Sequence, residues 1–153
     1  MIRSEYAAPA QRLVRQNGGV PGNLPFARSR RALLVSGCAV IVAGLLVRSV
    51  PGAVGDVAGG ILYAVLVFVL VALVFPATAG LRIGVMSLAV CVAVELLQLT
   101  GLPAVAAELL PPIRYVLGTT FVAADLIAYA GGSGLAVLVD RGLRWRTRTR
   151  ADQ

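Results

Sequence analysis

Long runs of apolar residues constrain this chain more than any other feature of its sequence. Residues 61–75 are fifteen apolar residues in succession, and three further stretches of similar length carry only isolated polar residues. An α-helix needs roughly 20 residues to cross about 30 Å of bilayer hydrocarbon. These runs do not alternate in polarity, as the strands of a membrane β-barrel do. They therefore predict transmembrane helices.

The spacing of the apolar runs predicts the number of helices. The connections at 51–56 and 76–82 are short and contain proline and glycine, whereas the connection at 100–120 is longer and contains two consecutive prolines. Within it, residues 104–110 are expected to form a short interfacial helix. The predicted fold is all-α, a four-helix transmembrane bundle within residues 32–139. Its spans are expected at 32–50, 57–75, 83–99 and 121–139.

The amino-acid composition supports a membrane protein and excludes several kinds of metal and catalytic site. The 153 residues are 58% hydrophobic and 14% charged, whereas soluble domains are about 45–50% apolar and about 25% charged. The chain has no His, which excludes His-based metal sites, catalytic triads and proton relays, and its two Cys cannot form a four-thiolate zinc site. We predict neither a metal nor a cofactor. A non-enzymatic role is favoured, with an enzyme as the open alternative.

Both ends of the chain are basic. Residues 1–31 hold six Arg and one acid and predict a flexible basic tail, and residues 140–153 predict a second basic tail. A cleaved signal peptide is disfavoured because the first apolar stretch is longer than the usual 7–15 residues. A nucleic-acid-binding arm is the alternative for the first tail. Since basic residues beside a span usually set topology, we predict no nucleic-acid partner.

The distribution of Arg predicts the orientation in the membrane. With four spans, both tails and the connection at 76–82 lie on one side, and that side carries twelve of the fourteen Arg. Short loops rich in Arg remain in the cytoplasm. We therefore expect both termini to be cytoplasmic.

Four ionisable residues fall at a similar depth near the outer leaflet: Arg48, Asp56, Glu95 and Asp125. An isolated charge in hydrocarbon costs about 2.5–3.5 kcal/mol on insertion scales. Such charges are tolerated if they face one another inside the bundle, where the guanidinium of Arg48 can bridge carboxylates. Helical spacing supports this arrangement, because each charged residue shares a stripe with small or hydrogen-bonding residues. Arg48 shares its stripe with Gly37, Ile41 and Gly44, and Asp56 shares its stripe with Gly60 and Tyr63. Glu95 shares its stripe with Cys91 and Gln98, and Asp125 with Gly118, Tyr129 and Gly132.

The polar residues define a candidate site with two interpretations. Glu95 could bind a cation or head group, or act as a general base. Alternatively, Glu95 and Arg48 form a structural ion pair that holds the helices in register. For the cluster as a whole a site is favoured. The predicted site contains Arg48, Asp56, Glu95, Gln98, Arg114, Asp125 and Tyr129.

Three sequence motifs resemble a known family. Residues 94–98 (VELLQ), 114–121 (RYVLGTTF) and 125–132 (DLIAYAGG) resemble domain of unknown function 2809, an uncharacterised bacterial membrane family similar in pattern to the VanZ-like proteins. The resemblance covers about residues 33–141. This sequence departs from the family pattern at residues 122–124, where Val-Ala-Ala precedes Asp125 and the family often has an aromatic residue. The resemblance implies the bacterial plasma (inner) membrane, and VanZ-like proteins imply a link to envelope glycolipids or to teicoplanin-type glycopeptide antibiotics.

Three functions remain open from the sequence. The first is a binding protein whose outer-leaflet pocket recognises an envelope lipid head group or a glycopeptide-like ligand. The second is a structural or assembly subunit with a membrane-protein partner. The third, an enzyme or proton-coupled transporter using Glu95 and Asp125, is disfavoured because four short helices leave little room for a path and no inverted repeat is evident. In each case the lipid bilayer is a partner.

Overall fold

The computed structural model describes residues 28–118 and 120–151. Almost all of the predicted basic tail at 1–31 lies outside these ranges. Within them the chain forms helices and no strands. The helices are α2 (Arg30–Val47), α3 (Ala53–Val74), α4 (Gly80–Gln98), α5 (Leu102–Leu109), α6 (Ile113–Leu117) and α7 (Ala123–Ala151).

Four helices are long and apolar enough to cross a membrane. They are α2, α3, α4 and the first part of α7, Ala123–Arg146. The 22 residues of α3 correspond to a length of about 33 Å, close to the hydrocarbon thickness of a bilayer. The predicted four-helix membrane bundle is confirmed.

The distribution of side chains between surface and interior also fits a bilayer. Large aliphatic side chains such as Leu34, Leu46 and Val85 are more than half exposed. The interior contains small and polar side chains, including the fully buried Ser87 and Cys91, beside larger apolar ones such as Phe68 and Ile83. In water, an apolar surface of this extent would drive association. In a membrane, large side chains face lipid and small ones let helices approach closely.

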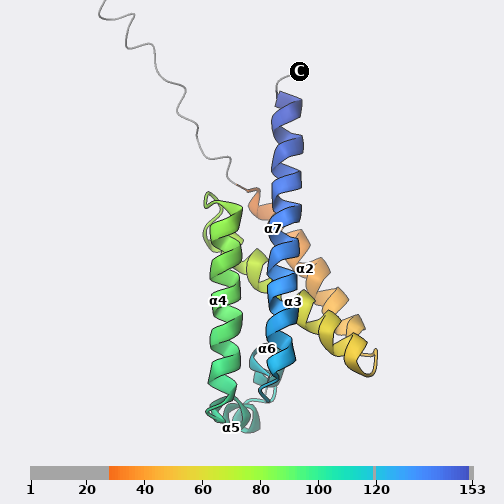
Figure 1. Ribbon diagram of the computed structural model, residues 1–153, viewed down its shortest axis with the longest axis vertical. Coiled ribbons are helices and arrows are strands. Elements are labelled where there is room, and N and C mark those ends of the chain that lie inside the picture. Colours follow the sequence, from red (N-terminus) through yellow and green to blue (C-terminus); the bar gives the residue numbers. More distant parts are fainter. Residues whose placement is uncertain (1–27, 119, 152–153) are drawn as a thin grey trace, which may run out of the picture.

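Helix α3 is the centre of the bundle. It packs on α2, α4 and α7, and α4 also packs on α7, whereas α2 packs mainly on α3. Figure 1 shows α4 and α7 running side by side, with α2 and α3 slanting away from them. Helices α5 and α6 lie at the end of the bundle where α4 stops and α7 starts.

Prolines and glycines set the helix ends. Helix α3 ends at Val74 because the residue before Pro76 is disfavoured in the helical conformation. Beyond the end of α4, Gly101 adopts a left-handed φ of 71°, which glycine accommodates without strain. The first three long helices differ from the predicted spans by a few residues at each end, and Arg48 lies one residue beyond α2. Helix α7 continues to Ala151, so the region predicted as a second tail is largely helical.

Small residues let α3 and α7 pack closely. A Cβ on Gly132 would lie 2.5 Å from the carbonyl oxygen of Ile61, and a Cβ on Gly60 would lie 2.8 Å from the Cβ of Ala128. Gly60 and Ala64 on one helix thus meet Ala128 and Gly132 on the other, with four-residue spacing on both, as in close membrane helix pairs. Because the backbones are close, the rings of Tyr63 and Tyr129 lie 5.8 Å apart.

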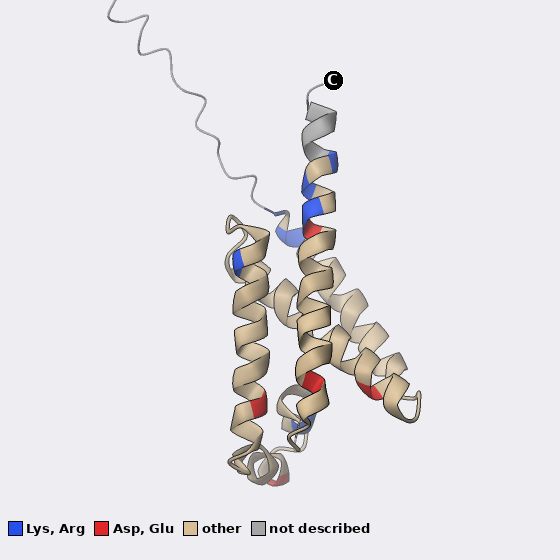
Figure 2. Cartoon of the chain, in the orientation of Figure 1, with Lys and Arg blue, Asp and Glu red and all other residues tan. Residues whose placement is uncertain are grey.

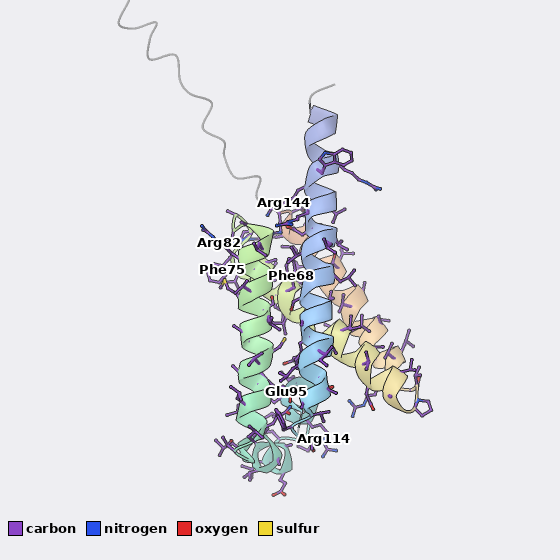
Figure 3. The ribbon with its side chains drawn as sticks, viewed as in Figure 1. Phe68, Phe75, Arg82, Glu95, Arg114 and Arg144 are labelled. Atoms are coloured by element: carbon purple, nitrogen blue, oxygen red, sulfur yellow. The ribbon has the colours of Figure 1, made fainter. Side chains whose placement is uncertain are left out.

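The charged residues divide between the two ends of the bundle. Figure 2 shows Arg gathered where α2 and α4 begin and along the last part of α7, and acidic residues mainly toward the opposite end. We call these the basic end and the acidic end; the acidic end is the one with α5 and α6. Figure 3 shows Arg82 and Arg144 at the basic end, and Glu95 and Arg114 toward the acidic end.

One acid belongs to the basic end. Asp140 accepts hydrogen bonds from Arg28 at 2.7 and 2.9 Å, and its carboxylate lies 3.2 Å from Nε of Arg144. Arg28 also donates to the carbonyl oxygens of Pro76 and Thr78. These contacts join the segment before α2, the α3–α4 turn and α7. The sequence assigned Asp140 to the basic tail and did not predict this junction.

Candidate functional site

The carboxylate of Glu95 is enclosed between α4 and α7. Its side chain is buried, with only 1% of its surface exposed, and Figure 3 shows it between these two helices. The hydroxyl of Tyr129 donates to Oε1 at 2.7 Å, and the backbone N–H of Val122 donates to Oε2 at 3.2 Å. Both carboxylate oxygens are therefore hydrogen-bonded to protein groups, as a buried polar side chain requires. The contact fixes the start of α7 against α4.

Gln98, one turn after Glu95, holds the neighbouring segment. Its Nε2 donates to the carbonyl oxygen of Leu117 at 2.6 Å. At Gly118, φ is 64° and a Cβ would collide with Nε2 of Gln98, so only glycine fits this position without strain. Glu95 and Gln98 thus anchor two successive parts of the chain, the end of α6 and the beginning of α7.

A large hollow lies on the other side of α7, between α2, α3 and the start of α7. Its volume is about 760 Å³. Four of its lining residues carry polar side chains: Arg48, Asp56, Tyr63 and Asp125. Asp56 and Asp125 each lie in the first turn of a helix, where the helix dipole favours a negative charge. We call this the first hollow.

A second hollow lies between Arg48 and the α5–α6 segment. Its volume is about 510 Å³, and its lining includes Arg48, Glu108, Arg114 and Gly118. Arg48 lines both hollows. Because of this shared residue, a ligand at Arg48 can extend into either hollow.

The two hollows differ in charge. The first contains one Arg and two Asp, whereas the second contains two Arg and one Glu. Their formal charges are therefore of opposite sign. Arginine binds phosphate and carboxylate groups through a planar set of donors, and carboxylates accept hydrogen bonds from ammonium and hydroxyl groups. Within the described residues, no group of three His, Cys, Asp or Glu side chains could hold a metal ion.

The predicted site residues thus occupy three environments. Glu95, Gln98 and Tyr129 are buried in the α4–α7 contact. Arg48, Asp56 and Asp125 line the first hollow, and Arg114 lines the second together with Arg48. The predicted ion pair between Arg48 and Glu95 stays a prediction.

Two polar lining residues, Tyr63 and Glu108, were missing from the predicted site. Tyr63 shares a helical stripe with Asp56, which is a signal in the sequence that identifies it. Glu108 belongs to the long connection at 100–120, and only the packing of α5 against α4 brings it to the second hollow.

Comparison with known families agrees with the resemblance seen in the sequence. A family model described as a protein of unknown function (DUF2809) matches residues 49–133, more than half of the chain. The chain belongs to this DUF2809 family. No curated protein and no solved structure matches it. The DUF2809 match begins one residue after Arg48, so it includes α3 to α6 and about the first third of α7, and α2 lies outside it.

Proposed function

We propose that this DUF2809 protein lies in the bacterial plasma membrane and binds the polar head group of an envelope lipid in the first hollow. The observation that carries the proposal is that three charged side chains at the ends of α2, α3 and α7, Arg48, Asp56 and Asp125, line one hollow with otherwise mainly apolar walls. Small-molecule sites have this character: apolar surroundings with a few convergent polar groups.

The shape of the first hollow favours an amphiphile. Its α2 wall runs from Val40 to Arg48, which is about 12 Å along a helix. Val40, Ile41 and Leu45 present aliphatic side chains, and the charged residues lie at the end of this wall. An acyl chain beside the aliphatic wall would place its head group at Arg48. We favour a lipid over a glycopeptide-like ligand because the charged residues gather at one end of an aliphatic wall, as the head group and chain of a lipid require.

The charge distribution supports an outward-facing site. The Arg residues of the basic end include Arg28, Arg30, Arg31, Arg82, Arg141, Arg144 and Arg146, whereas Arg48 and Arg114 line the hollows. The positive-inside rule places the more basic side in the cytoplasm. The hollows then open in the outer half of the membrane, with both termini inside the cell.

The alternative is a structural or assembly subunit. The hydrogen bonds of Glu95 and Gln98 support it, because they hold helices together without leaving those polar atoms exposed. In this case the ionisable residues of the first hollow would also serve to position helices or contact a protein partner. Replacing them would then lower the amount of protein or break a complex.

Substitution in cells separates the two functions. We would compare Arg48→Ala and Asp125→Asn with the control Arg82→Ala, which removes an exposed Arg that lines neither hollow. The binding function predicts unchanged protein levels and an altered sensitivity to envelope-directed drugs for the first two variants alone. Teicoplanin-type glycopeptides are the first drugs to test, given the VanZ-like pattern. Normal sensitivity with normal protein levels would reject the binding function, and a loss of protein would favour the structural one.

A further inference from the structure

We infer that the ligand is a phospholipid whose head group carries a primary ammonium, with its phosphate at Arg48 and Arg114 and its ammonium at Asp56 and Asp125. The inference rests on the proposed function and specifies the lipid class. It commits to a lipid, and not to a free phosphate ester, because the first hollow has a long aliphatic wall.

The phosphate is assigned from the second hollow. Arg48 and Arg114 both line it, with Glu108 as the only acid among its described lining residues. Two guanidinium groups around one volume favour a doubly contacted anion, and arginine matches phosphate oxygens with paired N–H donors. Arg48 places this phosphate at the border with the first hollow, because it lines that hollow as well.

The ammonium is assigned from the first hollow. Asp56 and Asp125 line this hollow together with Arg48, so its formal charge is negative. The part of the head group that follows the phosphate would enter this negatively charged region. An ammonium with N–H donors can bond to both carboxylates. A glycerol head group supplies no positive charge, and a quaternary ammonium has no N–H to donate.

The aliphatic wall completes the match. Leu62 and Leu66 of α3 face the same hollow as Val40 and Ile41 of α2, at levels deeper than the charged residues. Among the described helices, α2 packs mainly on α3, so this wall is formed by a single helix pair. A phospholipid acyl chain lying along it would extend from the head group toward the middle of the membrane.

Native mass spectrometry of the full-length protein in detergent tests the inference. The protein would be mixed with equal amounts of phosphatidylethanolamine, phosphatidylglycerol and phosphatidylcholine of identical acyl chains, and the retained lipid counted. We expect phosphatidylethanolamine to be retained at least about fivefold over each of the other two, since only it forms charge-assisted hydrogen bonds at both the phosphate and the amine.

Matched variants assign the two charges. Arg48→Ala and Arg114→Ala should lower retention of phosphatidylethanolamine and phosphatidylglycerol alike, whereas the control Arg82→Ala should change neither. The double variant Asp56→Asn with Asp125→Asn should abolish the preference while phosphatidylglycerol remains bound. Because the single variant Asp56→Asn alters only an exposed side chain, it tests the same point if the double variant does not fold.

The outcomes distinguish this inference from the proposed function. If retention depends on Arg48 but phosphatidylglycerol or phosphatidylcholine binds as well as phosphatidylethanolamine, the proposed function stands and the lipid class is wrong. If no lipid depends on Arg48 in a folded protein, the proposed function fails and the inference fails with it.

Discussion

Glu95 and Asp125 are two carboxylates from neighbouring helices at a similar depth, yet the protein surrounds them differently. Glu95 is buried and accepts hydrogen bonds from Tyr129 and from the backbone of Val122. Asp125 is partly exposed and lines the first hollow with Arg48 and Asp56. The comparison shows that depth in the membrane does not by itself define the role of a carboxylate.

The difference lies in which groups supply the hydrogen-bond donors. A buried carboxylate must find donors within the protein or lose a large amount of free energy, and Glu95 finds them on α7. A carboxylate beside a hollow can receive donors from a ligand. We therefore expect substitutions near Glu95 to change stability and substitutions around Asp125 to change binding.

The largest effect on stability is expected for Glu95→Leu. This change leaves the Tyr129 hydroxyl and the Val122 N–H without their acceptor, which should lower the free energy of unfolding by about 2–4 kcal/mol. Unfolding by SDS from mixed micelles measures it. Glu95→Gln is the matched control, because an amide can still accept from Val122 and donate to Tyr129. Equal stability of the Leu and Gln variants would show that Glu95 does not hold the helices.

Gly132→Ala should have the next largest effect, about 1–3 kcal/mol of lost stability. Its Cβ would lie 2.5 Å from the carbonyl oxygen of Ile61, so α3 and α7 must separate. The adjacent Gly131→Ala is an exact positional control, since a Cβ there meets no atom within 4 Å. The same unfolding experiment would contradict the close contact if both variants behaved alike.

Tyr129→Phe should lower stability by about 1 kcal/mol, within the range found for single hydrogen bonds in proteins and membranes. It removes the donor to Oε1 of Glu95 and keeps the ring that packs near Tyr63. The thermal unfolding midpoint in detergent is the readout, with Tyr63→Phe as the comparison. If the midpoint falls only for the Tyr63 variant, the stabilising contact is made by the hydroxyl of Tyr63 in the first hollow, and not by Tyr129.

The smallest change in stability is expected for Asp56→Asn, within about 0.5 kcal/mol of the parent protein. Asp56 is exposed at the start of α3, and asparagine keeps its size. The thermal midpoint should be unchanged while the preference among lipids weakens. A large loss of stability would assign Asp56 to the structure of the bundle and not to the hollow.

The sequence predicted the helices well because uninterrupted apolar runs and the prolines between them act locally. It also placed Cys91, Glu95 and Gln98 on one stripe, and the structure buries all three. It did not separate Glu95 from Asp125, because their environments depend on how α2, α3 and α7 cross. The ion pair of Asp140 was missed for a related reason. Its partner Arg28 lies 112 residues away in the sequence, and local sequence patterns do not predict contacts between such distant residues.

The most direct test is to measure lipid retention and the thermal unfolding midpoint together for Arg48→Ala and Tyr129→Phe. Our account predicts opposite results: Arg48→Ala loses bound phosphatidylethanolamine at an unchanged midpoint, and Tyr129→Phe lowers the midpoint but retains the lipid. If the two quantities fall together in both variants, the buried carboxylate and the hollow form one structural unit, and the division between them is contradicted.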